Sequence, residues 1–245
     1  MVRALFRNTL NSVMRNFRLI AFFSVPFLIA FLIPMLSPMP SFVAIGGTFL
    51  RFSSIPTDTS TADAIIISVF FLASLFLMCF AVVNINVVVK SERTITNIRR
   101  EVIDGIGKYT TKLLLIYLTA QLACLAADLL FYEYNMHRTL GTLFSTIVYA
   151  ALIFVPPALV IDDLRPFRAI EMSVKMLIKK FPLFLLWVLI GIILLTLLDL
   201  ILMLIKPFFF YTQLLLLVIN SLFIVPFLVV LLAHIYMGKY TIVGE

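Results

Sequence analysis

The chain has 245 residues, of which 63% are hydrophobic and 13% are charged, and its mean hydropathy is +1.15. Soluble domains are about 45–50% apolar and about 25% charged, so this composition excludes a soluble globular protein. A net charge of +7 is compatible with nucleic acid, but the lysines and arginines flank long apolar runs and favour a membrane surface instead. We expect an all-α membrane protein in which residues 1–245 form a single transmembrane domain.

Six apolar runs are long enough to cross a hydrocarbon core of about 30 Å as helices. They cover approximately residues 19–36, 64–89, 110–132, 140–161, 183–205 and 208–236. The first run exceeds the apolar core of a signal peptide, so we expect it to be retained as a span. Cys79 and Cys124 lie inside two of the runs, which predicts free buried thiols rather than a disulfide.

Positive charge is distributed unevenly about these six runs. Every lysine and arginine except Arg51, Arg138 and Lys206 lies in residues 1–18, 90–112, 162–180 or the tail after Tyr236. These segments share one side of the membrane if all six runs span it, and cytoplasmic segments carry an excess of Lys and Arg. We expect a multi-pass protein of the cell membrane with both termini in the cytoplasm.

Three basic connectors, each followed by two spans, have the pattern of an amphipathic helix on a membrane surface. Their apolar residues recur at spacings of three and four: Leu5, Val13 and Phe17 with polar Thr9 in the first, Ile95, Ile98, Val102, Ile106 and Tyr109 in the second, and Phe167, Ile170, Val174, Leu177 and Phe181 in the third. Aligning residues 15–19 with 179–183 places Thr9 on Ser173. This favours three parallel repeats, about 1–89, 90–161 and 162–236, although unrelated basic interfacial helices share these features.

Basic side chains on the other faces of the connectors can reach lipid phosphates. The candidates for contact with anionic head groups are Arg15, Arg18, Arg99, Arg100, Lys108, Lys175, Lys179 and Lys180. Each such cation contributes roughly 1 kcal/mol near an anionic leaflet. We therefore expect membrane lipids as partners and no nucleic acid, and a protein partner or a homo-oligomer is left open.

Residues 37–63 form the only long loop on the opposite side. Its apolar stretch, 42–50, is too short to span the bilayer but can enter the interface. The polar piece from Ser53 to Thr61 either covers an outward cavity as a lid or packs on the rim of the bundle.

Ionisable groups inside spans are costly, so each is a candidate functional residue. Asp199 in the fifth span and Asp128 in the third lie at nearly the same depth. The two carboxylates can line an outward-facing cavity or bind a cation. Alternatively, Asp199 pairs with Gln213 or Lys206, and Asp128 reaches the outer interface.

Prolines and neighbouring polar residues form a second candidate site. The prolines expected to kink or break spans are Pro26, Pro156, Pro157 and Pro226. The fourth span, 140–161, can also end early at Pro156, because the following proline disfavours helical geometry there. Asn220 and Ser221 lie one turn above Pro226, near mid-bilayer, where a broken helix can coordinate a small polar ligand. A kink satisfied by a neighbouring helix is the alternative.

The remaining polar residues indicate packing. Asn84, Asn86 and Gln121, together with Gly141-x-x-x-Ser145, are typical of close contacts between membrane helices. No His, Cys or carboxylate set has metal-ligand spacing, and no nucleophile–base pair or phosphate loop is present, so we expect neither a metal nor a cofactor.

Residues 156–183 carry a resemblance to a known family. The sequence Pro156-Pro157-Ala158-Leu159-Val160-Ile161-Asp162-Asp163, followed by Ala169-x-x-x-Ser173 and Lys180-Phe181, resembles a group of uncharacterised six-helix prokaryotic membrane proteins. Related helices form the membrane domain fused to some glycerophosphodiester phosphodiesterases. The resemblance implies a surface helix between the fourth and fifth spans. Asn16 matches the family's asparagine in the first unit, whereas Lys180 replaces it in the third, and we expect the catalytic barrel of the phosphodiesterases to be absent.

Two functions from different classes follow. The first is a non-enzymatic membrane protein that interacts with lipid and organises the bilayer, or holds a partner, through its basic rim. This function depends on the basic surface helices and on the lack of a polar stripe through any span. The second is a small-solute transporter or channel that uses Asp128, Asp199, Asn220 and the kinks at Pro26 and Pro226. We favour the first function and rank intramembrane catalysis below both.

Overall fold

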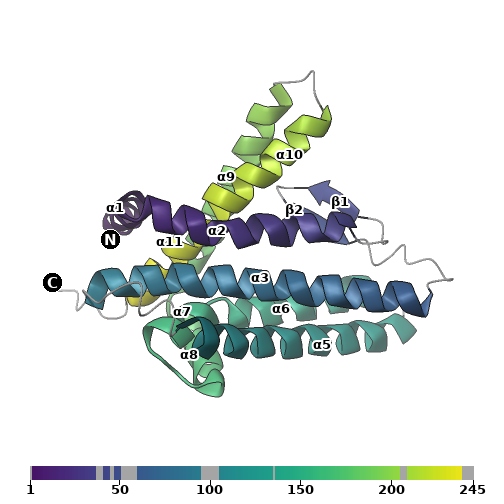
Figure 1. Ribbon diagram of the computed structural model, residues 1–245. Helices are drawn as coiled ribbons and strands as arrows, with labels where there is room; N and C mark the ends of the chain where they lie inside the picture. The colour runs from purple at the N-terminus through teal and green to yellow at the C-terminus, as the bar shows by residue number, and fades with distance from the viewer. Residues whose placement is uncertain are drawn as a thin grey trace.

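The computed structural model describes residues 2–36, 41–44, 47–50, 60–94, 105–134, 136–204 and 209–238 (Figure 1). The α-helices are α1 (Val2–Arg15), α2 (Phe17–Leu32), α3 (Thr61–Thr94), α5 (Thr111–Glu133), α6 (Thr142–Leu152), α7 (Val155–Ile161), α8 (Pro166–Lys179), α9 (Phe181–Leu204), α10 (Phe209–Ile219) and α11 (Val225–Met237). A 3₁₀ turn, η1 (Ile33–Leu36), extends α2, and the π-helical turns are η3 (Ile106–Thr110), η4 (His137–Gly141) and η5 (Asn220–Ile224). Two strands, β1 (Ser41–Ala44) and β2 (Gly47–Leu50), complete the regular structure of these residues.

The fold is a polytopic bundle of membrane-spanning helices, as predicted. Within the described residues, five helical segments are long and apolar enough to cross a bilayer, and the bent pair α1–α2 raises the number to six if it forms one span. The angle between α1 and α2 is 88°. α1 carries arginines along an amphipathic surface, whereas α2 is almost wholly apolar, so α1 suits the membrane interface and α2 the hydrocarbon core.

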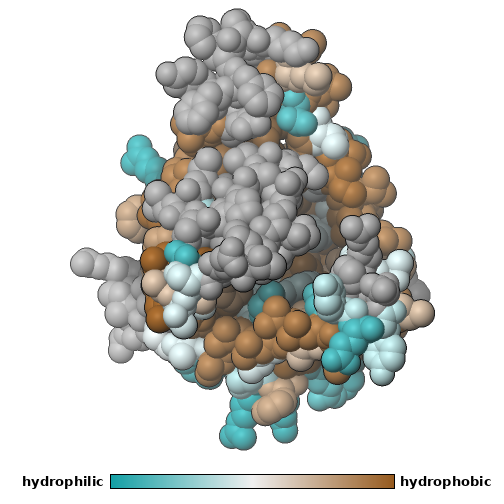
Figure 2. Space-filling model, turned by 90° about the vertical axis from the view of Figure 1, so that its right-hand side faces the viewer, coloured by the Kyte–Doolittle hydropathy of each residue, from teal (hydrophilic) through white to brown (hydrophobic). Residues whose placement is uncertain are grey.

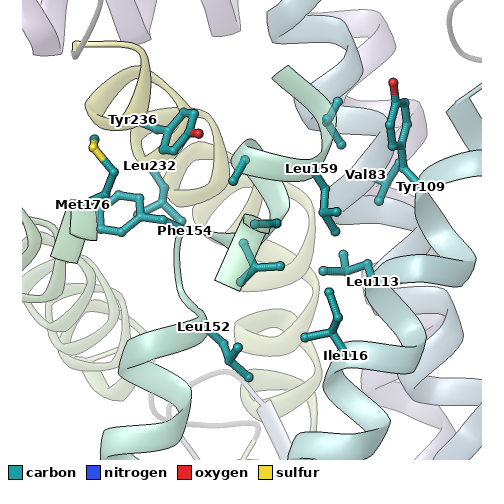
Figure 3. Packing of buried hydrophobic residues seen from close by; sticks show 14 of the residues in the cluster. Val83, Tyr109, Leu113, Ile116, Leu152, Phe154, Leu159, Met176, Leu232 and Tyr236 are labelled. Atoms are coloured by element: carbon teal, nitrogen blue, oxygen red, sulfur yellow. The ribbon is translucent and has the colours of Figure 1, made fainter. Parts of the chain in front are cut away.

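Buried side chains concentrate at one end of the bundle, which we call the packed end. It is formed by the C-terminal parts of α3, α7 and α11 together with α1 and α8 (Figure 1). The second half of α3 is enclosed on every side there, since Val83, Ile85 and Val88 on different faces are all fully buried. Phe154 and Tyr236 pack against each other in the same core (Figure 3). The two predicted free thiols, those of Cys79 and Cys124, are also buried.

The helices separate at the opposite end and expose apolar side chains. α9 and α10 lean away from α5 and α6 in Figure 1. Exposed leucines follow one another along α5 and α9, among them Leu122, Leu129, Leu189 and Leu200. The surface at this end contains broad hydrophobic areas (Figure 2). Lipid tails cover such areas without the penalty that water would impose, which is the arrangement expected of a bundle inside a bilayer.

The fourth span does not end at Pro156, and that alternative was wrong. α6 ends at Leu152, and α7 begins at Val155 with both prolines in its first turn. Backbone N–H groups in the first turn of a helix have no acceptor within the helix, so a proline loses no hydrogen bond there. Pro156 and Pro157 therefore start a new helix. Pro226 similarly lies in the first turn of α11, directly after η5.

Residues 41–50 contain a hairpin that their apolar character did not predict. β1 and β2 pair antiparallel, with Phe42 opposite Phe49 and Val43 opposite Thr48. The glycine pair Gly46-Gly47 between the two apolar stretches was the available signal, because such pairs suit tight hairpin turns. β2 contacts η1 and α2, so this part of the loop packs beside the first span. Residues 51–59, most of the predicted lid or rim segment, lie outside the described residues.

Candidate functional site

The first corner of the packed end is the junction of α1 and α2. Asn16 separates the two helices with φ −109° and ψ 24°. The carboxylate of Glu92, near the end of α3, accepts a 2.5 Å hydrogen bond from the Ser12 hydroxyl and a second from the side-chain amide of Asn16. A charged acceptor makes stronger hydrogen bonds than a neutral one. Glu92 therefore holds α1 and the junction residue in the 88° bend.

α1 has a packed face and an outward face. Thr9 and Ser12 are buried where α1 contacts α11. On the outward face Met14 is 76% exposed and Phe17 is 49% exposed. Four arginines on α1 and the first turn of α2 are exposed and have no acidic partner among the described residues, and the last two lie next to Met14 and Phe17 in the chain: Arg3, Arg7, Arg15 and Arg18. The first corner thus presents apolar and cationic groups together.

The second corner, the junction of α8 and α9, has the same geometry. Lys180 separates the two helices with φ −113° and ψ 25°. Ile178 is 74% exposed and Phe181 is 49% exposed, beside the exposed Lys179. The aromatic ring of each corner packs on another phenylalanine, with ring centroids 6.3 Å apart for Phe17 at the first corner and 6.2 Å apart for Phe181 at the second.

The most deeply buried residues of α8 are small or flexible: Ala169, Ser173 and Met176 are buried against α6 and α7. Of the predicted stripe, Ile170 and Leu177 are half-buried and pack against the same core, whereas Phe167 points outward. Small residues let the helices approach closely, and the outward position of Phe167 suits contact with lipid. The stripe is therefore divided between the bundle and the surface.

The Ser173 hydroxyl joins α8 to the break in the fourth span. It donates a 2.5 Å hydrogen bond to the carbonyl of Ala151 and accepts a 3.0 Å hydrogen bond from the backbone N–H of Phe154. Both backbone groups lie where α6 stops, and a break in a helix leaves such groups without helical partners. Ser173 thus supplies hydrogen-bond partners to the two backbone groups at the break and holds α8 against it.

Two of the predicted lipid-contact lysines have acidic partners. Lys108 pairs with Asp163 at 2.5 Å, and Lys175 pairs with Glu171 at 2.6 Å. The side chains of the first pair are each 47% exposed. Arg99 and Arg100 lie outside the described residues. The predicted contacts whose side chains are exposed on the packed end are thus Arg15, Arg18 and Lys179. Lys180 is half-buried, with its ammonium group near Gly238 at the end of α11.

The junction before α5, which we call the third corner, differs from the other two. Its aromatic residue, Tyr109, is only 7% exposed, and the ammonium group of Lys108 lies 5.1 Å from the centre of its ring. Burial acts to raise the pKa of Asp163, but hydrogen bonds from Lys108 and Tyr109 outweigh burial, so this pKa lies below its ordinary value. Asp163 also has a φ of 51°, a left-handed conformation that Asp and Asn tolerate better than most residues. The cation of the third corner is therefore paired with Asp163, which lies in the connector between α7 and α8.

Further polar links connect the ends of the core helices. Lys90 donates a 2.9 Å hydrogen bond to the carbonyl of Val160, and the buried Tyr236 donates a 2.5 Å hydrogen bond to Asp162. Together with Glu92 and Asp163, these residues were not predicted as parts of a site. The available signal was chemical, since Glu92, Asp162 and Asp163 are acids in or next to strongly basic connectors.

The predicted intramembrane carboxylates do not come together. Asp199 is exposed on the part of α9 that leans away in Figure 1, and Asp128 lies near the end of α5. The carboxylate of Asp128 lies against Gly141, so close that a Cβ atom at that position would overlap it. The side chain of Gln213 and the whole of Lys206, the proposed partners of Asp199, lie outside the described residues.

The predicted mid-bilayer site lies in a π-helical turn between α10 and α11. Asn220 and Ser221 are buried in η5, which contacts α2, and the Ser221 hydroxyl donates to the carbonyl of Val218. π-Helical turns inside α-helices are often found at functional sites. Pro26 lies inside α2, which continues as a helix on both sides of it.

No family model, curated protein or solved structure matches this chain. The described residues also contain no group of three or more His, Cys, Asp or Glu side chains placed to hold a metal ion.

Proposed function

We propose that this chain is a non-enzymatic protein of the cell membrane that binds anionic phospholipid through α1 and α8. In this proposal the packed end and both termini face the cytoplasm, where basic segments and anionic lipids are enriched. By holding lipid there, the protein organises the inner leaflet or positions a partner on it. The three-unit repeat and the relationship to the six-helix prokaryotic family belong to the same proposal.

The observation that carries the proposal is the outward face of the two corners. Met14 and Phe17 lie exposed beside Arg15 and Arg18, and Ile178 and Phe181 lie exposed beside Lys179. Apolar side chains next to cations that have no acidic partner in the described part of the chain suit the boundary between acyl chains and phosphates. Water alone gives the exposed apolar groups no favourable environment.

Small-solute transport is less well supported. It requires polar groups that converge on a path through the bilayer, whereas Asp128 and Asp199 lie on helices that diverge. The buried pair Asn220 and Ser221 is one local polar feature and does not make a path.

The test measures the selectivity of the protein for anionic lipid in a bilayer. The chain is reconstituted in phosphatidylcholine, and the fraction of spin-labelled phosphatidylglycerol immobilised on it is compared with that of spin-labelled phosphatidylcholine. We expect a preference for phosphatidylglycerol that decreases with salt. A variant with Arg15, Arg18, Lys175, Lys179 and Lys180 all changed to Gln should lose the preference. An unchanged preference in that variant would overturn the proposal.

A further inference from the structure

We propose that the first and second corners are two separate, equivalent sites, each of which binds one anionic phospholipid molecule, and that the third corner is not such a site. The first corner consists of Met14, Arg15, Phe17 and Arg18, and the second of Ile178, Lys179, Lys180 and Phe181. The inference rests on the proposed function and adds the number, position and chemistry of the sites.

The two corners match in backbone and in exposure. α1 and α8 are each 14 residues long, and each is followed by a single junction residue with nearly the same φ and ψ. The exposed fractions are 76% for Met14 and 74% for Ile178, and 49% for both Phe17 and Phe181. On the opposite face, Thr9 and Ser173 are both completely buried. The same surface therefore occurs twice.

Each corner matches the chemistry of a phospholipid rather than that of a free anion. The apolar pair can contact the first methylenes of an acyl chain, and the cations beside it can contact the phosphodiester. Arg15 and Arg18 offer planar guanidinium groups that can bind phosphate oxygens in pairs. The second corner offers the exposed ammonium group of Lys179 and, beside it, the half-buried Lys180, whose ammonium group lies near Gly238 at the end of α11. We expect the first corner to bind the more tightly.

The two sites are independent because different helices support them. α1 contacts α11, and Glu92 of α3 holds its junction. α8 contacts α6 and α7, and Ser173 fixes it at the break between them. Figure 1 shows α1 and α8 at the same end of the bundle but on different sides of α3. Occupation of one corner should leave the other unchanged.

The third corner, over its described residues 105–110, presents neither an exposed aromatic ring nor an uncompensated lysine. Tyr109 is buried where Phe17 and Phe181 are half exposed, and the charge of Lys108 is compensated by Asp163 at 2.5 Å. A phosphate would have to displace that carboxylate. Lys108→Gln is therefore a matched control that removes one cation of the packed end without removing a site.

The test is a titration of the purified chain in neutral detergent with phosphatidylglycerol, followed by native mass spectrometry that counts bound lipids. We expect two tightly bound lipids on the wild type and on Lys108→Gln. The pair Arg15→Gln and Arg18→Gln should remove one, and the pair Lys179→Gln and Lys180→Gln should remove the other. Each loss should weaken its site by about tenfold or more. Lys179→Arg with Lys180→Arg should retain both lipids, which separates loss of charge from loss of structure.

The outcomes distinguish this inference from the proposed function. If all four substitutions together leave phosphatidylglycerol bound as in the wild type, both the function and the two sites are wrong. If the four together abolish binding but either pair alone also removes all of it, the corners form one site and only the inference fails. Loss of a lipid in Lys108→Gln would likewise overturn the inference, because the third corner would then be a site. Equal binding of phosphatidylcholine would contradict the role of charge.

Discussion

At the scale of single residues, Ser173 shows how a membrane bundle accommodates a broken helix. Inside a bilayer, backbone groups freed by a break cannot turn to water and must find partners in the protein. The hydroxyl of Ser173 is both donor and acceptor and supplies the two bonds from a neighbouring helix. The same contact positions α8, so one side chain serves both the span and the surface helix.

Replacing Ser173 with Ala should lower the stability of the packed end. The carbonyl of Ala151 and the N–H of Phe154 would lose their partner, at about 1–3 kcal/mol for each buried group left unpaired. The apparent melting temperature in detergent, followed by circular dichroism, should fall clearly for Ser173→Ala. Ile178→Ala, a change on the exposed side of the same helix, should melt with the wild type. Equal melting of the two variants would show that Ser173 does not support the break.

At the scale of elements, short polar links set how the helices meet at the packed end. The link of Lys108 to Asp163 ties η3 to the connector between α7 and α8, and Tyr236 ties α11 to the same connector through Asp162. Both bonds join segments far apart in sequence, by 55 and 74 positions. Each helix forms from the local pattern of its sequence, but these side-chain bonds determine which other segment it packs against.

The Asp163 link predicts a pH dependence of stability. Its pKa is lowered on folding, so the carboxylate stabilises the fold above its unfolded pKa of about 3.9 and loses this effect as the pH falls through the lower folded pKa. The pair is about half exposed, so the effect should stay below about 1 kcal/mol. Asp163→Asn, which tolerates the same backbone conformation, should melt slightly below the wild type at pH 7.

The measurement that checks this link is the difference in melting temperature between the wild type and Asp163→Asn from pH 7 to pH 3. The difference in melting temperature should shrink below pH 4. The wild-type carboxyl then begins to be protonated and becomes neutral, as the amide of the variant is at every pH. A difference that stays constant down to pH 3 would mean that the charge of Asp163 contributes nothing. Lys108→Gln should show the same trend if the two residues act as a pair.

At the scale of the whole molecule, the surface helices show a common relation to the bundle. α8 packs on α6 and α7, the broken span that precedes it, and α1 packs on α11, the last helix of the chain. The ends of α3, α7 and α11 contact one another at the packed end.

This arrangement places α1 and α8 on one side of the membrane. Cysteines introduced by Arg15→Cys and Lys179→Cys should both react with a membrane-impermeant maleimide only after cells are opened, since we propose that this side is cytoplasmic. Tyr134→Cys, at the other end of α5, should react in intact cells. The native cysteines are buried and should give little background. Labelling of positions 15 and 179 from opposite sides would contradict the fold.

The sequence alone determined the class of this protein, its long apolar helices and two of the three predicted amphipathic connectors, α1 and α8, because the length of an apolar run and the period of an amphipathic helix are local properties. Residues 95–104 of the remaining connector lie outside the described residues. The sequence did not determine where the fourth span breaks, which face of α8 packs, or that Lys108 is paired while Arg15 and Lys179 are open. These features depend on bonds between distant residues, such as that of Ser12 with Glu92, 80 positions away. Only the tertiary structure shows which of these charges have an acidic partner among the described residues, as Lys108 has in Asp163.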